Sequence, residues 1–172
     1  MRSAIVGGRT PNLLALHYDG ARWEAQNLIL IPRFAFPLSC LEKRKPLGPT
    51  ARRRGWVGCN ILLTSIPLDA RIQLLVERVP VPAARVREQY ARLRPLEKLK
   101  HETRGWTLDV LNVVRSIGRQ EFALAEVYVH EAALARLHPD NLHIRDKIRQ
   151  QLQVLRDLGF VEFLGAGSYR AL

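Results

Sequence analysis

The sequence predicts an α+β protein in which a small mixed α/β module, residues 1–100, precedes a helical module with a C-terminal β-hairpin, residues 101–172. Short apolar runs bounded by Gly and Pro dominate the first module, whereas apolar residues at helical spacing dominate after Trp106. The charge is divided in the same way. The first module carries 18 Lys and Arg against 7 Asp and Glu, and the second carries 9 against 9. A chain of 172 residues is long enough for two small cores.

A β-hairpin is predicted at the start of the first module. Apolar and aromatic runs at Leu13–Tyr18 and Trp23–Ile31 lie on either side of Asp19-Gly20. This dipeptide is typical of tight hairpin turns, and we expect it to supply the position with positive φ that such a turn requires. Pro32 and Pro37 then end the hairpin, because proline cannot donate to the strand ladder.

The rest of the first module predicts one short helix, two strands and a connecting helix. Ser39-x-x-Glu42 has the pattern of a capping box and predicts a short helix that Pro46 ends. Cys59–Leu63 and Arg71–Val76 are typical of strands. The basic segment Arg85–Lys100 predicts a connecting helix and linker. Its apolar face consists of Val86, Tyr90 and Leu93.

Three helices and a hairpin are predicted for the second module. Thr107 is expected to cap a helix that runs to Ile117 and buries Leu108, Leu111 and Val114. The second helix is expected over Leu124–Leu137, with Val127, Leu134 and Leu137 facing inward, and the third over His143–Leu158. The strands Phe160–Leu164 and Tyr169–Leu172 flank a glycine turn. This order of elements is the winged-helix arrangement, a variant of the helix-turn-helix.

The third helix of this module has an outer face rich in hydrogen-bond donors. Its apolar stripe is Ile144, Ile148, Leu152, Leu155 and Leu158, so we expect the other face to point away from the core, with Arg145, Asp146, Arg149, Gln150, Gln153 and Arg156 on it. The candidate DNA-contacting residues here are Arg145, Lys147, Arg149, Gln150 and Gln153. Arginine can pair bidentately with guanine and glutamine with adenine in the major groove. The alternatives are a solvated helix face or a protein-binding winged helix.

A second candidate surface is a basic cluster with a neighbouring tryptophan. The basic residues are Lys43, Arg44, Lys45, Arg52, Arg53 and Arg54, and prolines and glycines between them prevent one continuous helix. Such a segment can follow a phosphate backbone. Trp56, between Gly55 and Gly58, could stack on a base or contact a methyl group, or it could belong to the core of the first module.

No catalytic or metal-binding motif is evident. The chain has no Asp/Glu-x-Lys triplet, Glu42-Lys43-Arg44 being the nearest approach, and its five histidines lack paired metal spacing. Cys40 and Cys59 are expected to be buried free thiols. No apolar run approaches the roughly 20 residues of a membrane span and no signal peptide is evident, so a cytoplasmic protein is expected. The basic excess favours a nucleic-acid partner over an acidic protein or a membrane surface.

Several segments resemble the DpnI-type, or Dam-replacing, methyl-directed restriction endonucleases. They are Glu42–Leu47, Pro49–Ile61, Arg104–Leu108 and Lys147–Asp157, and the similarity extends from about Pro11 to the end. The resemblance implies a PD-(D/E)xK nuclease domain with a zinc-binding insertion, followed by a winged helix. It also implies Mg²⁺-dependent cleavage of GATC sites that carry N6-methyladenine.

This sequence has no counterpart of the family's catalytic acidic residues and lysine or of its zinc cysteines. The resemblance therefore implies the distal part of the nuclease domain and the recognition surfaces, without a catalytic site or cofactor in this chain. We expect double-stranded, adenine-methylated DNA as the partner, no membrane partner and no cleavage by the isolated chain. The chain could be a truncated reading frame, a frame with a late start codon, a decayed gene, or one part of a split enzyme that a separate N-terminal nuclease fragment would complete. The alternative is a non-catalytic transcriptional regulator or methyl-DNA reader.

Overall fold

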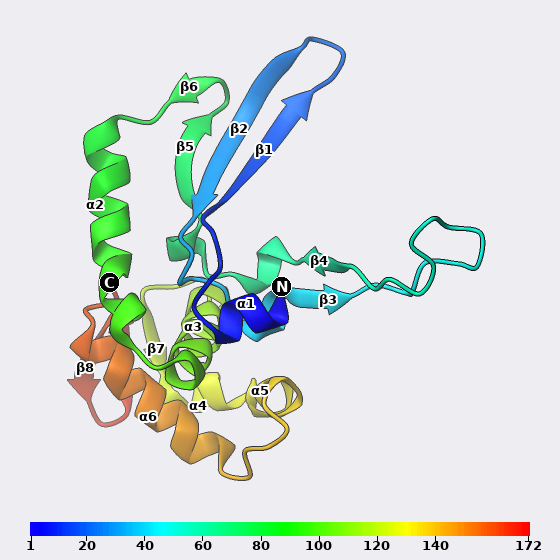
Figure 1. Cartoon of the computed structure of the whole chain (residues 1–172). Helices are drawn as coiled ribbons and strands as arrows, with labels where there is room; N and C mark the ends of the chain where they lie inside the picture. The colour runs from blue at the N-terminus through cyan, green and yellow to red at the C-terminus, as the bar shows by residue number, and fades with distance from the viewer.

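The computed structural model describes residues 1–172 as a mixed helix-and-sheet protein, which confirms the predicted class. Figure 1 shows a helical body from which two hairpins project in different directions. One is the long hairpin of β1 (Leu13–Asp19) and β2 (Glu24–Ile31). The other is a narrow arm that contains β3 (Leu41–Lys43) and β4 (Cys59–Ile61).

The long hairpin belongs to a four-stranded antiparallel sheet in the order β1-β2-β5-β6, completed by β5 (Ile72–Val76) and β6 (Val79–Pro80). The hairpin was predicted, but the position with positive φ is Trp23, at 57°, and not Asp19 or Gly20. The Asp19 carboxylate accepts the backbone N–H groups of Ala21 and Arg22 at 3.0 and 3.3 Å. These bonds make the turn longer than a two-residue turn, so the residue with positive φ, Trp23, is the last one before β2.

The predicted helix after Ser39 was wrong. Leu38–Cys40 forms a single 3-10 turn, η1, and the chain then enters β3, which pairs in register with β4. The Ser39 hydroxyl donates to Asp109 Oδ1, 70 residues away, and so cannot cap a local helix. The strand predicted at Cys59–Leu63 is shorter than expected and ends at Ile61.

The remaining elements of the first module are helices and 3-10 turns. They are α1 (Arg2–Val6), η2 (Leu63–Ser65), η3 (Leu68–Ala70), α2 (Ala83–Leu93) and η4 (Arg94–Lys98). The sequence did not predict α1. The predicted face of α2 is confirmed, because Leu93 is buried and Val86 and Tyr90 pack against the core. Tyr90 also contacts Phe34 edge to face.

The second module is a winged helix, as predicted. Its elements are α3 (His101–Ser116), β7 (Glu121–Ala123), α4 (Leu124–Tyr128), α5 (Glu131–Leu137), α6 (Ile144–Asp157), β8 (Val161–Gly165) and β9 (Ser168–Ala171). The sheet order is β7-β9-β8, with β7 a strand that the sequence did not predict. The third predicted helix is α6, whose N-terminus follows the turn after α5.

Two details of the helical predictions were wrong. Thr107 does not cap α3, which begins six residues earlier at His101. Its hydroxyl lies in the buried interior, 2.8 Å from the Thr103 carbonyl oxygen. The predicted second helix is two helices, α4 and α5, separated at Val129 and His130. The break turns Leu137 outward, so that this side chain is exposed instead of buried, while Val127 and Leu134 are buried as predicted.

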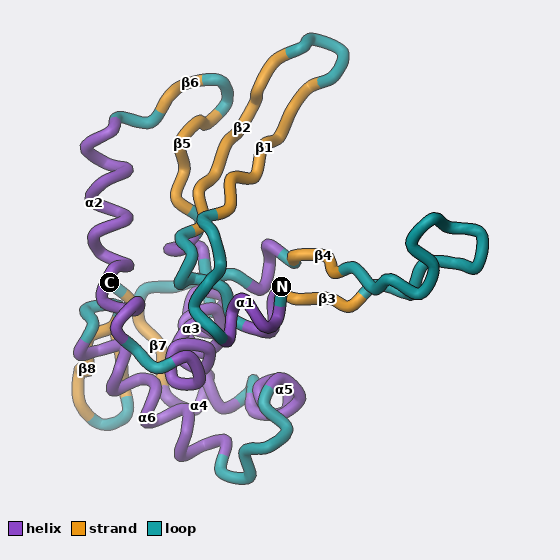
Figure 2. Tube along the Cα trace, viewed as in Figure 1, coloured by secondary structure: helices purple, strands orange, loops and turns teal.

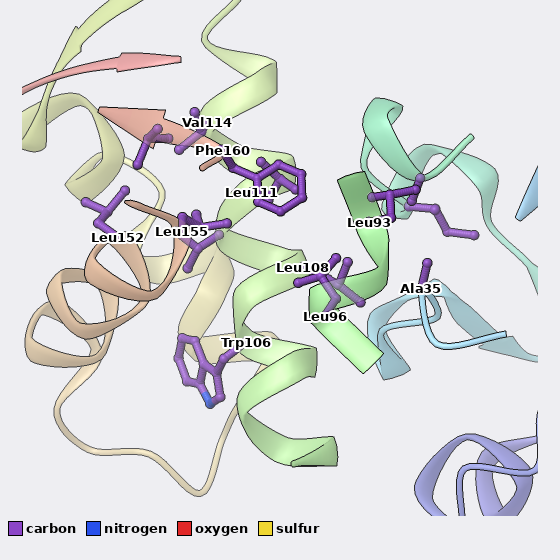
Figure 3. Close-up of a cluster of buried hydrophobic side chains, with 14 of the residues drawn as sticks. Ala35, Leu93, Leu96, Trp106, Leu108, Leu111, Val114, Leu152, Leu155 and Phe160 are labelled. Carbon is purple, nitrogen blue, oxygen red and sulfur yellow. The ribbon is translucent and has the colours of Figure 1, made fainter. Parts of the chain in front are cut away.

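The buried apolar side chains form one cluster that spans both modules. Figure 3 shows α3 as the shared wall, with Trp106, Leu111 and Val114 toward Leu152 and Leu155, and Leu108 toward Leu96. A largely buried ion pair between Arg115 Nη2 and Asp69 Oδ1, 2.7 Å apart, also joins α3 to η3. The two modules are therefore held together by apolar packing and by a buried charge pair.

Candidate nucleic-acid interface

The arm, defined here as residues 41–61, carries the predicted basic cluster into solvent. Figure 2 shows its tip as a long loop beyond β3 and β4. Two backbone hydrogen bonds extend the ladder into this loop. The N–H of Arg44 donates to Gly58 O at 3.0 Å, and that of Leu47 donates to Trp56 O at 2.9 Å. The loop is thus a continuation of the hairpin and is held in shape by the backbone.

A single carboxylate, that of Glu42, opposes the positive charge of the arm. All six predicted basic side chains are exposed, and no Asp or Glu occurs between Lys43 and Leu68. We call these six side chains the arm cations: Lys43, Arg44, Lys45, Arg52, Arg53 and Arg54. None of them makes an ion pair or a side-chain hydrogen bond within the chain. An unpaired guanidinium group can donate all of its N–H groups to a ligand, which makes the arm a strong attractor for polyanions.

Trp56 lies on the surface of the arm. Its side chain is 52% exposed, so the alternative of a core tryptophan was wrong. The indole passes close over Gly58: a Cβ at that position would lie 2.9 Å from Cζ3 of the ring. Gly55, at φ 77°, forms the turn that precedes it. The two flanking glycines therefore shape the backbone around the indole, and about half of the side chain remains open to solvent.

The structure confirms that the predicted outer face of α6 points away from the core. Ile144, Ile148, Leu152 and Leu155 are buried, while Arg145, Arg149, Gln150 and Gln153 are exposed and Lys147 is half-buried. Gln150 and Gln153 make no side-chain hydrogen bond within the chain, so their amide groups are available to a ligand. The buried Gln151 was not predicted. Its Oε1 lies 2.7 Å from the Thr107 hydroxyl, and its Nε2 has no partner.

The arginines of α6 differ from those of the arm because acidic and aromatic neighbours hold them. Arg145 Nε donates to Glu131 Oε2 at 2.7 Å, and its guanidinium lies 5.1 Å from the centre of the Tyr128 ring. Arg149 donates to the Tyr128 hydroxyl at 3.0 Å and pairs with Asp146, and these hydrogen bonds raise its pKa. Tyr128 and Glu131 were missed by sequence reasoning, because they come from helices α4 and α5.

A hollow of about 560 Å³ lies at the N-terminal end of α6. Its lining includes Leu142 and His143 from the preceding turn and Asp146, Lys147 and Gln150 from the helix. Leu142 is 88% exposed, so nearly its whole side chain is open to contact with a ligand. The hollow therefore combines an apolar side chain with hydrogen-bond donors at the end of the helix that the sequence singled out.

The structure contains no group of three or more His, Cys, Asp or Glu side chains that could hold a metal ion. Glu42, in the nearest approach to a catalytic triplet, instead accepts a hydrogen bond from Asn60 Nδ2 at 2.8 Å. This pair lies across β3 and β4, where Glu42 opposes Asn60 in the ladder. The carboxylate therefore has a structural partner and no second acidic group beside it.

The prediction that both cysteines are buried was half wrong. Cys40 is buried, and its burial raises the pKa of the thiol to about 12, whereas Cys59 is exposed on β4. Cys59 is exposed because its strand belongs to the arm, which has no layer packed over it. No helix of the protein combines the length and the apolar character that a membrane crossing requires.

Comparison with known families matches nearly the whole chain in two parts. A family model described as the Dam-replacing family matches residues 1–99. A model described as the Dam-replacing HTH domain matches residues 102–171, which include α3 to β9. The second match agrees with the winged-helix geometry and indicates DNA binding. Structure and comparison thus identify the same part of the chain as a helix-turn-helix module.

Proposed function

The chain belongs to the Dam-replacing family, and we propose that it binds double-stranded DNA with a preference for GATC sites carrying N6-methyladenine. The observation that carries the proposal is the coexistence of two unlike surfaces. One is an arm with six unpaired cations, and the other is a neutral winged helix whose α6 presents uncommitted amide groups. The first suits the phosphate backbone and the second suits base edges.

In this proposal α6 enters the major groove with its N-terminal end foremost. Gln150 and Gln153 donate to and accept from base edges, and Arg145 and Arg149 are held in position by Tyr128 for contacts with guanine or phosphate. The methyl group of N6-methyladenine also projects into the major groove. A helix that lies in the major groove can contact this methyl group. At the N-terminal end of α6, Leu142 supplies an exposed apolar side chain for such a contact.

The arm contributes affinity and, through Trp56, a second contact with the base. The arm cations donate to phosphate oxygens and release counterions, which strengthens binding to any duplex. An exposed indole can stack on a base or cover a methyl group, which makes its contribution depend on the base. The arm is therefore proposed to supply most of the salt-dependent affinity, and Trp56 part of the methyl preference.

We further propose that the four-stranded sheet is the distal part of a nuclease domain whose catalytic groups are not among residues 1–172. Mg²⁺ would be the metal of an intact family member, but the residues present do not fit it, because no acidic cluster exists to hold it. In this proposal the catalytic groups lie on a separate nuclease fragment. The same observation favours a second candidate, a non-catalytic methyl-DNA reader or regulator.

The test is equilibrium binding to three duplexes at one salt concentration: methylated GATC, unmethylated GATC and a scrambled sequence. We expect the methylated duplex to bind most tightly. Gln153→Ala should weaken binding to the methylated site by roughly 5- to 150-fold if the side chain makes a bidentate base contact, while changing the scrambled duplex little. Equal affinity of the wild type for all three duplexes would refute the sequence and methyl preference.

A further inference from the structure

A cleft of about 640 Å³ separates the base of the arm from the C-terminal end of α5. Leu38, Leu41 and Val57 line it on the side of the arm, and Leu137 and Pro139 line it on the side of the winged helix. The outward turn of Leu137, which the sequence did not predict, is what places this leucine in the cleft. The apolar part of the lining is thus contributed by both modules.

Three cations line the same cleft, and no acidic residue does. Arg2 comes from α1, Lys43 from β3 and Arg136 from the last turn of α5. None of the three makes an ion pair or a side-chain hydrogen bond within the chain. Positive side chains that approach one another without a counter-charge repel, so the arrangement is most favourable when an anion occupies the cleft.

Arg136 stands out among the arginines of the winged helix. Six others, at 115, 119, 145, 149, 156 and 170, pair with carboxylates, and Arg104 donates to the Leu99 carbonyl oxygen. Arg136 is the one arginine of residues 101–172 without any such partner. A module that neutralises its other guanidinium groups internally leaves this one available, and it faces the cleft.

A buried polar bridge fixes the two walls of the cleft relative to one another. Asp109 on α3, only 5% exposed, accepts a hydrogen bond of 2.5 Å from the hydroxyl of Ser39, which lines the cleft. Its other oxygen lies 2.8 Å from Nε2 of His138, the residue between Leu137 and Pro139. The His138 ring stacks on buried Trp106, with ring centres 3.6 Å apart. These contacts fix the positions of Ser39 and His138, and with them the two walls of the cleft.

We propose that this cleft binds a phosphodiester group of the DNA backbone between Lys43 and Arg136, so that one duplex contacts both the arm and the winged helix. The proposal rests on the proposed function. The guanidinium of Arg136 and the ammonium of Lys43 donate to phosphate oxygens from opposite walls, and the apolar lining residues pack against the adjoining sugar. Arg2 adds a third positive charge at the rim.

The experiment compares full-length Arg136→Ala with Arg85→Ala. Arg85 is also exposed and without a partner, but it lies on α2, on the other side of the body from the arm in Figure 1. Both variants lose one positive charge. Affinity for a GATC duplex is measured over a range of salt concentrations. We expect Arg136→Ala to reduce the salt slope by about 1, Arg85→Ala to leave it unchanged, and Arg136→Lys to keep most of it.

Equal slopes for Arg136→Ala and Arg85→Ala, in folded proteins that bind DNA, would overturn the inference and leave the proposed function intact. A wild type that binds no DNA would refute the proposed function itself. A measurement with inorganic phosphate tests whether the cleft binds a free phosphate ion instead of a phosphate of the DNA backbone. If phosphate at constant ionic strength raises the Tm of the wild type but not of Arg136→Ala, while the DNA salt slopes stay equal, the cleft binds a free phosphate and the duplex assignment is wrong.

Discussion

Neutralising two arm cations, in the double variant Arg52→Ala/Arg53→Ala, should make DNA binding markedly less sensitive to salt. Both guanidinium groups are exposed and neither has an intramolecular partner to give up, so each can make a full phosphate contact. A phosphate contact contributes about 0.9 to the slope of log K against log salt, so the pair accounts for about 1 to 2 units. Over a fourfold rise in salt, 1.8 units correspond to about a twelvefold difference in affinity loss.

The assay is fluorescence anisotropy of a labelled duplex at four salt concentrations between about 50 and 200 mM, the range in which such slopes are usually compared. The matched control is Arg85→Ala/Arg87→Ala, which removes the same charge from exposed sites on α2. The arm variant should weaken methylated and unmethylated duplexes alike. If both double variants give the wild-type slope, or if both reduce it equally, the reasoning that the arm itself contacts phosphates is refuted.

Four other outcomes follow from the structure. Trp56→Ala should change the free energy of unfolding by less than ~1 kcal/mol, because the side chain is half exposed. It should also reduce the difference in affinity between methylated and unmethylated sites, while the salt slope stays unchanged. A sharp fall in Tm with that difference in affinity intact would contradict this. Gln151→Met should stabilise the protein by about 1 kcal/mol, which corresponds to a rise in Tm of roughly 2–4 °C. The substitution removes a buried amide whose Nε2 has no partner, while the Thr107 hydroxyl keeps its bond to the Thr103 carbonyl oxygen. A lower Tm would show that the amide is needed. Residues 101–172 alone should melt cooperatively with high helicity, but at a lower temperature than the full chain, because the Arg115–Asp69 pair and the apolar packing of α3 against the first module are lost. A broad, non-cooperative transition would count against the domain boundary. The purified chain with Mg²⁺ should not cut plasmid methylated at GATC; site-specific products that persist through further purification would contradict it.

The parts of the fold that sequence reasoning obtained correctly are those fixed by local periodicity. The stripe from Ile144 to Leu155 determines which face of α6 is buried, because a helix places every third or fourth residue on one side. The β1–β2 hairpin follows in the same way from two apolar runs around a turn. The predicted clustering of the arm cations needed only their closeness in the sequence, and their exposure follows from their charge.

The errors have different causes, and only the first of them is long-range. Ser39 has a capping pattern, but its hydroxyl binds Asp109, and its neighbours pair with a strand that begins at Cys59. Thr107 looks like a helix cap, yet it lies inside α3, where its hydroxyl bonds to the turn before it. The break at Val129 and His130 has no glycine or proline to signal it. It is also what turns Leu137 into the cleft.

The central claim is that phosphate contacts and base contacts come from different residues, and one measurement tests it most directly. The affinity of the wild type is measured across the same salt range for methylated and unmethylated GATC duplexes. Both duplexes carry the same phosphates, so the account predicts two parallel lines, with the methylated duplex binding more tightly at every salt concentration. Coincident lines would show that the methyl group is not read, and lines of clearly different slope would show that methylation changes the phosphate contacts, which contradicts the division of roles proposed here.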